Sequence, residues 1–337
     1  MFGTSPPCLP QPITLFLLPK FSMMGFASAI EPLRSANRMS GRALYTWHIL
    51  SKDGAPVIAS NGIPVVPEAG IEKVERCETL ILCGGLDVHL YRDKSVFAWL
   101  RRLDRQGADI GAISTGSHAL ARAGLLDGYR CTIHWEGLAA FREEFPNIEI
   151  TTELFELDRN RFTCSGGTAA LDLMLNLIAS QHGHELAASV SDQFIHERIR
   201  HAHDHQRMSL PARLGIRHPK LIAVIRLMEE HIEEPLSRAQ LARDAELSTR
   251  QLERLFRKYL QRTPTRHYLE IRLSRARLLL QQTDLSVLDV ALACGFVSAS
   301  HFSKCYREFF GKKPREERMT SVPLRFGKAE PAAASGD

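Results

Sequence analysis

The chain has 337 residues, of which 44% are hydrophobic and 24% charged, and its net charge is +5, a composition typical of a folded protein of about two domains. No run of about 18 uncharged apolar residues occurs, so no membrane span is predicted, and the first twelve residues lack the pattern of a secretory signal. The seven cysteines form no CxxC pair, which disfavours a disulfide framework or a zinc site. We therefore expect a cytoplasmic protein with no metal and no cofactor.

Charge is unevenly distributed along the chain. Residues 211–320 hold 21 Lys and Arg against 13 Asp and Glu, whereas residues 1–210 carry a net charge of −3. A basic block behind a mildly acidic body is typical of a nucleic-acid-binding module, although a solvated basic surface fits the charge alone equally well. We expect a disordered leader at 1–12, a first domain at 13–206, a linker at 207–217, a second domain at 218–320 and a disordered tail at 321–337.

The first domain alternates apolar runs with helical segments. Apolar runs lie at 13–19, 47–51, 79–85 and 109–115, and helices are predicted at 21–38 and 94–107. This alternation predicts a doubly wound, flavodoxin-like α/β sheet, in which ligands bind at the carboxyl ends of the strands. The segments expected at that edge are 19–22, 84–86 and 114–117.

The stretch GAISTGSHALARAGLLDGYRCTIHW places Ser114 at a sharp strand-to-helix turn, the position of a nucleophile elbow. With His134 as base and amides near Gly85 and Thr115 as an oxyanion hole, Ser114 would make the chain an amidase or hydrolase. The alternative is that Ser114 only donates a hydrogen bond in a ligand pocket. We prefer this alternative because no second carboxylate is placed to orient His134.

The same stretch resembles the class I glutamine amidotransferase-like (ThiJ/PfpI) superfamily, in which this turn carries a catalytic cysteine. Ser114 replaces that cysteine, and Gly25 falls about where the family has the acid that activates it. The resemblance therefore implies the amidotransferase-like fold, with Ser114 and His134 as a vestigial elbow and no catalytic residue.

The second domain opens with a predicted helix at 218–234 that Pro235 stops. Ser237 and Ser248 are placed to cap two short helices behind it. Two short helices, a tight turn and a basic outer face are what a helix-turn-helix unit needs, and we predict one at 236–260. The residues expected at the major groove from this unit are Thr249, Arg250, Glu253, Arg254 and Lys258.

The pattern recurs at 285–310, where Asp284 or Ser286 caps the first helix, Gly295 makes the turn and Ser298 caps the second helix. A long amphipathic helix at 264–282 would hold the two units about one DNA turn, roughly 34 Å, apart. The residues expected at the groove from the second unit are Ala299, Ser300, His301, Lys304 and Arg307. Arg272 and Arg315 are expected to contact phosphates or to have structural roles, rather than to read bases.

Residues 221–318 resemble the DNA-binding domain of the AraC/XylS family, notably in IRLSRARLLLQQTDLSVLDVALACGFVSASHFSKCYREFFGKKPREER. Glu246 and Gln261 depart from the family pattern because glycine is usual there. The whole arrangement resembles GlxA-type AraC regulators, and ASNGIPV and CSGGTAALDLMLNLI resemble the group responsive to carnitine and glycine betaine. The resemblance implies a transcription regulator that binds double-stranded DNA as a homodimer, contacts RNA polymerase and activates catabolic genes for a small nitrogen compound.

Other hypotheses stay open at this point. The inducer would be a quaternary amine, or else arginine or another amino acid. The chain would otherwise be a Ser114 hydrolase fused to a DNA-binding module, or a DNA-binding protein whose first domain only oligomerises.

Aromatic faces bind quaternary ammonium groups, so Phe21, Trp47 and Trp135 are candidates, with Glu31 or Glu136 as counter-charge. For Phe21 and Trp47 a place in the core is at least as plausible. A carboxylate end would meet amides and hydroxyls. The full predicted ligand set is Phe21, Ser22, Trp47, Asn61, Gly85, Ser114, Thr115, His134, Trp135 and Glu136.

Six histidines lie between residues 182 and 205 and could form a metal or pH-sensitive cluster. His201, His203 and His205 are spaced by two and therefore share no helix face. We interpret the stretch as a solvated segment and predict no metal site.

Overall fold

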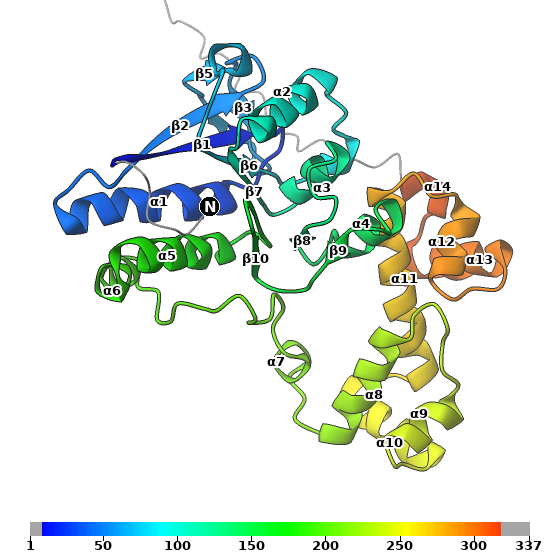
Figure 1. Cartoon of the computed structure of the whole chain (residues 1–337). Helices are drawn as coiled ribbons and strands as arrows, with labels where there is room; N and C mark the ends of the chain where they lie inside the picture. Colours follow the sequence, from blue (N-terminus) through cyan, green and yellow to red (C-terminus); the bar gives the residue numbers. More distant parts are fainter. Residues whose placement is uncertain (1–8, 318–337) are drawn as a thin grey trace, which may run out of the picture.

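The structure is a computed structural model that describes residues 9–317. The predicted tail, residues 318–320 and most of the predicted leader lie outside the described residues. An α/β body is followed by a helical body, as Figure 1 shows in blue to green and in yellow to red.

A seven-stranded sheet forms the centre of the α/β body, in the order β10-β11-β7-β6-β1-β2-β5. Its strands are β1 (Gln11–Leu17), β2 (Tyr45–Ser51), β5 (Ala69–Gly70), β6 (Thr79–Cys83), β7 (Asp109–Ile113), β10 (Phe155–Asp158) and β11 (Arg161–Cys164). All neighbours pair in parallel except β10, which runs antiparallel at one edge. The chain order reverses between β1 and β6, and the crevice outside the strand ends at such a point is where ligands of these sheets bind.

Helices cover both faces of the sheet. On one face lie α1 (Met23–Ser40), α5 (Ala169–His182) and α6 (His184–Gln193); on the other lie α2 (Lys94–Arg105), α3 (Gly116–Arg122) and α4 (Leu138–Glu144). Along β1, Ile13, Leu15 and Leu17 pack on the first face, and Phe16 packs on the second. Successive residues of β1 thus face opposite sides of the sheet, and the side chains on both sides are apolar, as expected for a buried parallel strand. The arrangement confirms the predicted doubly wound sheet.

The predicted strands at 79–85 and 109–115 both end two residues early, because Gly84 and Ser114 already belong to turns that leave the sheet. The pattern analysis missed the short elements, which carry too few residues for a period. These are β3 (Val57–Ile58), β4 (Pro64–Val65), β8 (Arg130–Cys131), β9 (Glu149–Ile150), η1 (Ile71–Lys73) and η2 (Val88–Leu90).

The helical body contains two pairs of short helices joined by one long helix. Its helices are α8 (Pro219–Glu230), α9 (Arg238–Asp244), α10 (Thr249–Leu260), α11 (Pro264–Gln282), α12 (Val287–Ala293), α13 (Ala299–Phe310) and α14 (Pro314–Glu317). Ser237 and Ser248 cap α9 and α10 with capping boxes, and Ser286, not Asp284, caps α12.

Two expectations for this region need correction. The predicted helix at 218–234 ends at Glu230, five residues before Pro235, because His231 leaves the helical conformation. The predicted linker at 207–217 also contains a short helix, α7 (Leu210–Leu214), which Gly215 ends in the left-handed conformation.

The long helix α11 contributes to the cores of both pairs. Tyr268 packs with Leu252 and Phe256 of the first pair, whereas Leu273 and Ala276 pack with the second. The two bodies also touch, since Ala139 of α4 is 1% exposed and lies among the apolar side chains of the second pair. Figure 1 shows α4 beside α11.

Four turns of the helical body use left-handed backbone. Glu246 (φ 53°) and Gln261 (φ 55°) take the conformation that Gly295 (φ 73°) and Gly311 (φ 75°) take at the matching places of the second pair. The turns are therefore kept although Glu246 and Gln261 replace the glycines usual in the family. The backbone of these two residues is strained, since the left-handed conformation costs an L-residue about 1–2 kcal/mol.

We predict that Gln261→Gly raises, and Gly311→Gln lowers, the free energy of unfolding by about 1 kcal/mol each. A Cβ at Gly311 would meet no atom within 4 Å, so the substitution there tests mainly backbone strain. Urea unfolding of the full chain measures both changes. Effects of the same sign in the two variants would contradict the prediction.

Candidate functional site

Helix α10 presents a cationic surface. Thr249, Arg250, Arg254 and Lys258 are exposed, and within residues 9–317 no ion pair or hydrogen bond engages the two arginine side chains. Glu253 differs, because its carboxylate accepts a hydrogen bond of 2.8 Å from Arg238 of α9. Glu253 therefore ties the two helices of the pair together.

Helix α13 is less densely charged. Ser300, His301, Lys304 and Arg307 are exposed and Ala299 is half-buried. The His301 ring lies 3.4 Å from the Cys305 sulfur. Val297 is 95% exposed in the turn before α13, and no sequence pattern distinguishes it from a core valine. An apolar side chain at this place suits a thymine methyl group.

Arg272, expected at a phosphate or in a structural role, makes its contacts inside the second helix pair. Its guanidinium donates hydrogen bonds of 2.7 Å to the carbonyls of Cys294 and Gly295 and lies 4.1 Å from the ring centre of Phe296. Burial lowers its pKa from the ordinary value of 12.5. Arg272 therefore holds the turn of the second pair from inside. Arg315 is exposed at the start of α14.

Ser114 lies at a strained turn between β7 and α3. Its φ is 61°, its amide donates to the carbonyl of Cys164 at 2.8 Å, and its side chain is buried. Gly166 packs directly against it, because a Cβ on Gly166 would lie 2.6 Å from the Ser114 Cβ. The predicted elbow geometry is therefore present.

His134 does not complete a catalytic pair with Ser114. The His134 amide donates to the Ser114 carbonyl at 3.3 Å, but within residues 9–317 no hydrogen bond joins the imidazole to the Ser114 hydroxyl. The ring lies 3.8 Å from the Glu136 carboxylate. Burial lowers the pKa of His134 from its ordinary value of 6.5, and the nearby Glu136 carboxylate opposes this shift. This geometry suits ligand binding better than proton transfer.

The remaining polar residues of the predicted pocket connect neighbouring turns. The Thr115 hydroxyl donates to the Gly85 carbonyl at 2.5 Å, and the Ser22 hydroxyl caps α1 at the Gly25 amide. A Cβ on Gly85 would lie 2.1 Å from the Lys20 carbonyl, so glycine is required there. Asn61 is exposed in the β3–β4 turn and accepts from the Ile63 amide.

Phe21 and Trp47 are not placed to bind a ligand. Phe21 is 0% exposed and packs edge-on against Phe26 in the core. Trp47 lies opposite Ile13 in the register of β1 and β2. It is in the amino-terminal half of β2, whereas the predicted ligand site is at the carboxyl ends of the strands. Both predicted aromatic contacts are corrected to packing roles, because the side chains belong to or pack on the α1–α5 core.

A cavity of about 200 Å³ lies where β11 passes into α5. It brings together His134 and Trp135 from the predicted set with residues that the sequence analysis missed. The cavity is lined by His134, Trp135, Leu154, Ser165, Gly166, Gly167, Thr168, Ala169, Arg200 and Gln206. The missed residues come from two distant segments, 154–169 and 200–206, whose proximity no local pattern records.

Arg200 is fixed beside this cavity. Its guanidinium donates to the Asp172 carboxylate at 2.6 and 2.8 Å and to the Thr168 hydroxyl at 2.8 Å. Asp172 is 0% exposed and also accepts from His196 at 2.9 Å. His196, in the histidine stretch interpreted as solvated, therefore helps to hold the cavity wall through Asp172.

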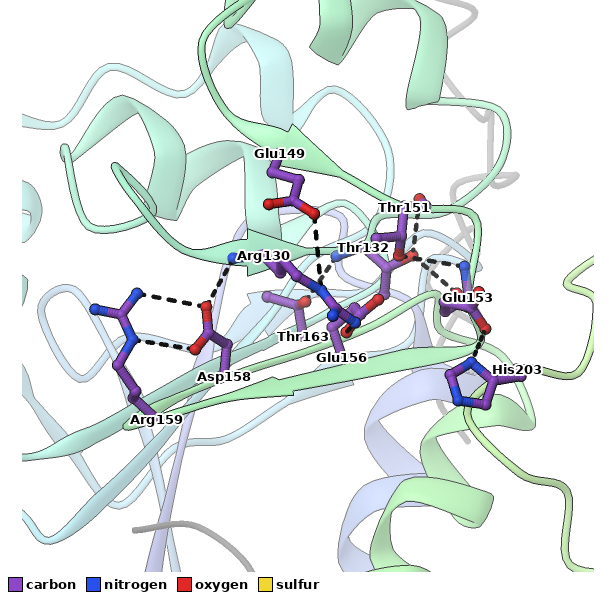
Figure 2. Close-up of polar contacts among 10 residues, drawn as sticks. All are labelled: Arg130, Thr132, Glu149, Thr151, Glu153, Glu156, Asp158, Arg159, Thr163 and His203. Atoms are coloured by element: carbon purple, nitrogen blue, oxygen red, sulfur yellow. Dashed lines mark hydrogen bonds and ion pairs between the residues drawn. The ribbon is translucent and has the colours of Figure 1, made fainter.

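A polar layer supports the other side of the cavity (Figure 2). The Thr132 amide donates to the Thr163 hydroxyl at 2.8 Å, and the Thr132 hydroxyl donates to the Glu153 carbonyl at 2.8 Å. The Glu153 carboxylate lies 3.0 Å from the His203 ring. At the far end of this layer, Arg159 pairs with Asp158 at 3.0 Å.

Residues 9–317 contain no group of three or more His, Cys, Asp or Glu side chains that could hold a metal ion. Among the helices in this part of the chain, none has the length and apolar character of a membrane span.

Comparison with known proteins places both bodies in families. Residues 12–180 match the DJ-1/PfpI family and residues 241–320 match a helix-turn-helix domain. The HTH-type transcriptional regulator GbdR of Pseudomonas aeruginosa is 52% identical over 310 residues, which are 92% of this chain and 84% of that protein. The regulator CdhR of the same species is 49% identical over 324 residues, 96% of each chain.

A solved AraC family transcriptional regulator from Pseudomonas putida superimposes with a TM-score of 0.50 at 31% identity, over 55% of this chain and 100% of that chain. These relatives favour a regulator over the hydrolase hypothesis. The chain belongs to the AraC-type helix-turn-helix transcriptional regulators that carry an amino-terminal DJ-1/PfpI domain.

Proposed function

We propose that this regulator is a cytoplasmic, effector-responsive activator of catabolic genes, and that a small organic cation bound at the Trp135 cavity controls how α10 and α13 meet operator DNA. The observation that carries the proposal is that α11, which joins the helix pairs of α10 and α13, packs beside α4 of the domain that holds the cavity. A homodimer that contacts RNA polymerase is the form in which we expect it to act.

Arg250 and Arg254 are the proposed base readers of the first pair. Both lie on the outer face of α10 with guanidinium groups that nothing in residues 9–317 engages, and arginine binds guanine in the major groove through two parallel hydrogen bonds. Thr249 and Lys258 flank them on the same helix. Glu253 helps to position α9 against α10 and would meet DNA only at the edge of the contact.

The second pair reads DNA mainly through Lys304. Ala299, Ser300 and His301 would lie at the groove, and their small or neutral side chains give few hydrogen bonds to base edges. Arg307 and Arg315 are exposed and suit phosphate contacts, which position the protein without reading sequence.

The effector chemistry follows from the cavity. Trp135 offers an aromatic face, which attracts organic cations, and the backbone at Gly166–Gly167 with the Thr168 hydroxyl offers polar partners for the other end of a small zwitterion. The sequence resemblance implies a quaternary amine, with arginine as the alternative. Glu136, exposed beside His134, would add counter-charge at the rim.

The dimer proposal is supported by an exposed apolar surface. Ile58, Ile63 and Val66, on and beside the β3–β4 hairpin, are each more than half exposed. Clustered apolar side chains of this kind mark interaction surfaces. Two copies would present four reading helices to one operator.

We predict that Arg254→Ala and Lys304→Ala each weaken binding to the preferred promoter fragment by about 1–3 kcal/mol, because each removes a base contact. Binding to random duplex should change much less. Fluorescence anisotropy over a salt series measures both. The matched control is Arg105→Ala, an exposed arginine on α2 of the first domain; equal losses in all three variants would contradict the assignment.

We predict that Trp135→Ala abolishes the thermal stabilisation of the full chain by whichever of glycine betaine, L-carnitine and L-arginine stabilises the unaltered protein. The reason is loss of the cation–π contact. Trp47→Ala should lower the melting temperature itself yet keep the ligand-induced increase, since Trp47 packs on the core. A thermal-shift titration separates the two effects, and persistence of the increase in Trp135→Ala would refute the site.

A further inference from the structure

The face of Trp135 already holds a cation from the chain itself. The guanidinium carbon of Arg207 lies 4.3 Å from the centre of the Trp135 ring. Arg207 is exposed and stands at the first position of the segment that connects the two bodies. A guanidinium at this distance makes a cation–π contact, the same interaction that an organic cation would need.

The residue before Arg207 is anchored in the cavity wall. The Gln206 side-chain amide donates to the Thr132 hydroxyl at 3.0 Å, to the Ile133 carbonyl at 3.0 Å and to the Glu153 carbonyl at 2.9 Å. Arg207 is therefore the last residue held by the α/β body before the chain continues through exposed Met208 to α7.

The segment upstream of Gln206 is held independently of Trp135. The Leu154 amide donates to the Ala202 carbonyl at 2.8 Å. The His203 ring lies 3.0 Å from the Glu153 carboxylate, and Figure 2 draws this contact. Release of Arg207 would consequently free the connecting segment from residue 207 onward and leave the wall behind it in place.

We infer that Arg207 is an internal occupant of the cation site on Trp135, which an effector cation must displace, and that this displacement releases the segment leading to the DNA-binding helices. The inference rests on the proposed effector site. One aromatic face accommodates one cation, so the effector and Arg207 exclude each other. Occupation by Arg207 lowers the fraction of protein that is competent to bind the effector. The apparent dissociation constant equals the intrinsic one divided by that competent fraction, so the effector binds more weakly.

The inference also defines which ligands act. A purely anionic compound would leave Arg207 on Trp135 and would not release the segment. A quaternary ammonium or a guanidinium compound would compete directly, because both are weakly hydrated cations that pack against aromatic rings.

Isothermal titration of the full chain with glycine betaine, L-carnitine and L-arginine tests the competition. For each probe that the unaltered protein binds, Arg207→Ala should bind about 2- to 30-fold more tightly, the range that one cation–π contact represents. Arg207→Lys should fall between the two. Arg159→Ala is the matched control, because Arg159 lies 3.7 Å from the Tyr129 ring centre on the far side of the polar layer, and it should leave the affinity unchanged.

Limited trypsin digestion tests the contact without any ligand. Trypsin needs a free arginine side chain, so Trp135→Ala and the milder Trp135→Phe should speed cleavage after Arg207 several-fold in the ligand-free full chain. Cleavage after Arg217, an exposed arginine of the same segment, provides the internal reference and should not change relative to the unaltered protein.

Unchanged probe affinity in Arg207→Ala, or unchanged cleavage after Arg207 in both Trp135 variants, would overturn the inference. The proposed function fails separately, if the unaltered protein binds none of the three probes. In that case the cleavage ratio alone decides whether Arg207 is held by Trp135.

Discussion

The constraint on which DNA recognition depends is that one helix belongs to two cores. Helix α11 has 19 residues, about 28 Å of helix, and its first half packs into one helix pair through Tyr268 while its second half packs into the other through Leu273 and Ala276. The two reading helices therefore cannot move independently without exposing apolar surface. Their separation is set by the length of a helix rather than by a loop, and this favours a fixed spacing of operator half-sites.

The cavity lies near the start of two of the connections between the α/β body and the helical body. His134 and Trp135 precede α4 by only a few residues, and α4 places Ala139 in the core beside α11. Gln206 and Arg207 begin the covalent connection to α8. A ligand shifts such a system only by binding two arrangements with unequal affinity, and the contest between a ligand cation and Arg207 for one aromatic face supplies that inequality.

Sequence patterns predicted the structural features that depend on residues close together in the chain. The serine caps at 237, 248 and 286 and the apolar strands at 13, 79 and 109 follow from local spacing, and the structure has them. Roles that depend on distant residues were beyond such patterns. The sequence left Arg272 between a phosphate contact and a structural role. The fold places its guanidinium against the carbonyls of Cys294 and Gly295 and the ring of Phe296. Of the residues that line the cavity, the sequence predicted only His134 and Trp135, since Thr168, Arg200 and Gln206 reach it only through the fold.

The turn at Ser114 keeps the geometry of a nucleophile elbow, while its contacts are those of a structural turn. Its left-handed backbone is costly for serine and persists only where the surroundings determine it. Here the Ser114 amide is bound by Cys164, its carbonyl accepts from His134, and Gly166 packs on its Cβ. Each of these partners leads directly into the cavity wall, through Ser165–Thr168 on one side and Trp135 on the other. Because no hydrogen bond within residues 9–317 joins the imidazole to the Ser114 hydroxyl, while the backbone contacts of Ser114 lead into the cavity wall, the strained turn suits the shape of the cavity better than the activation of a nucleophile.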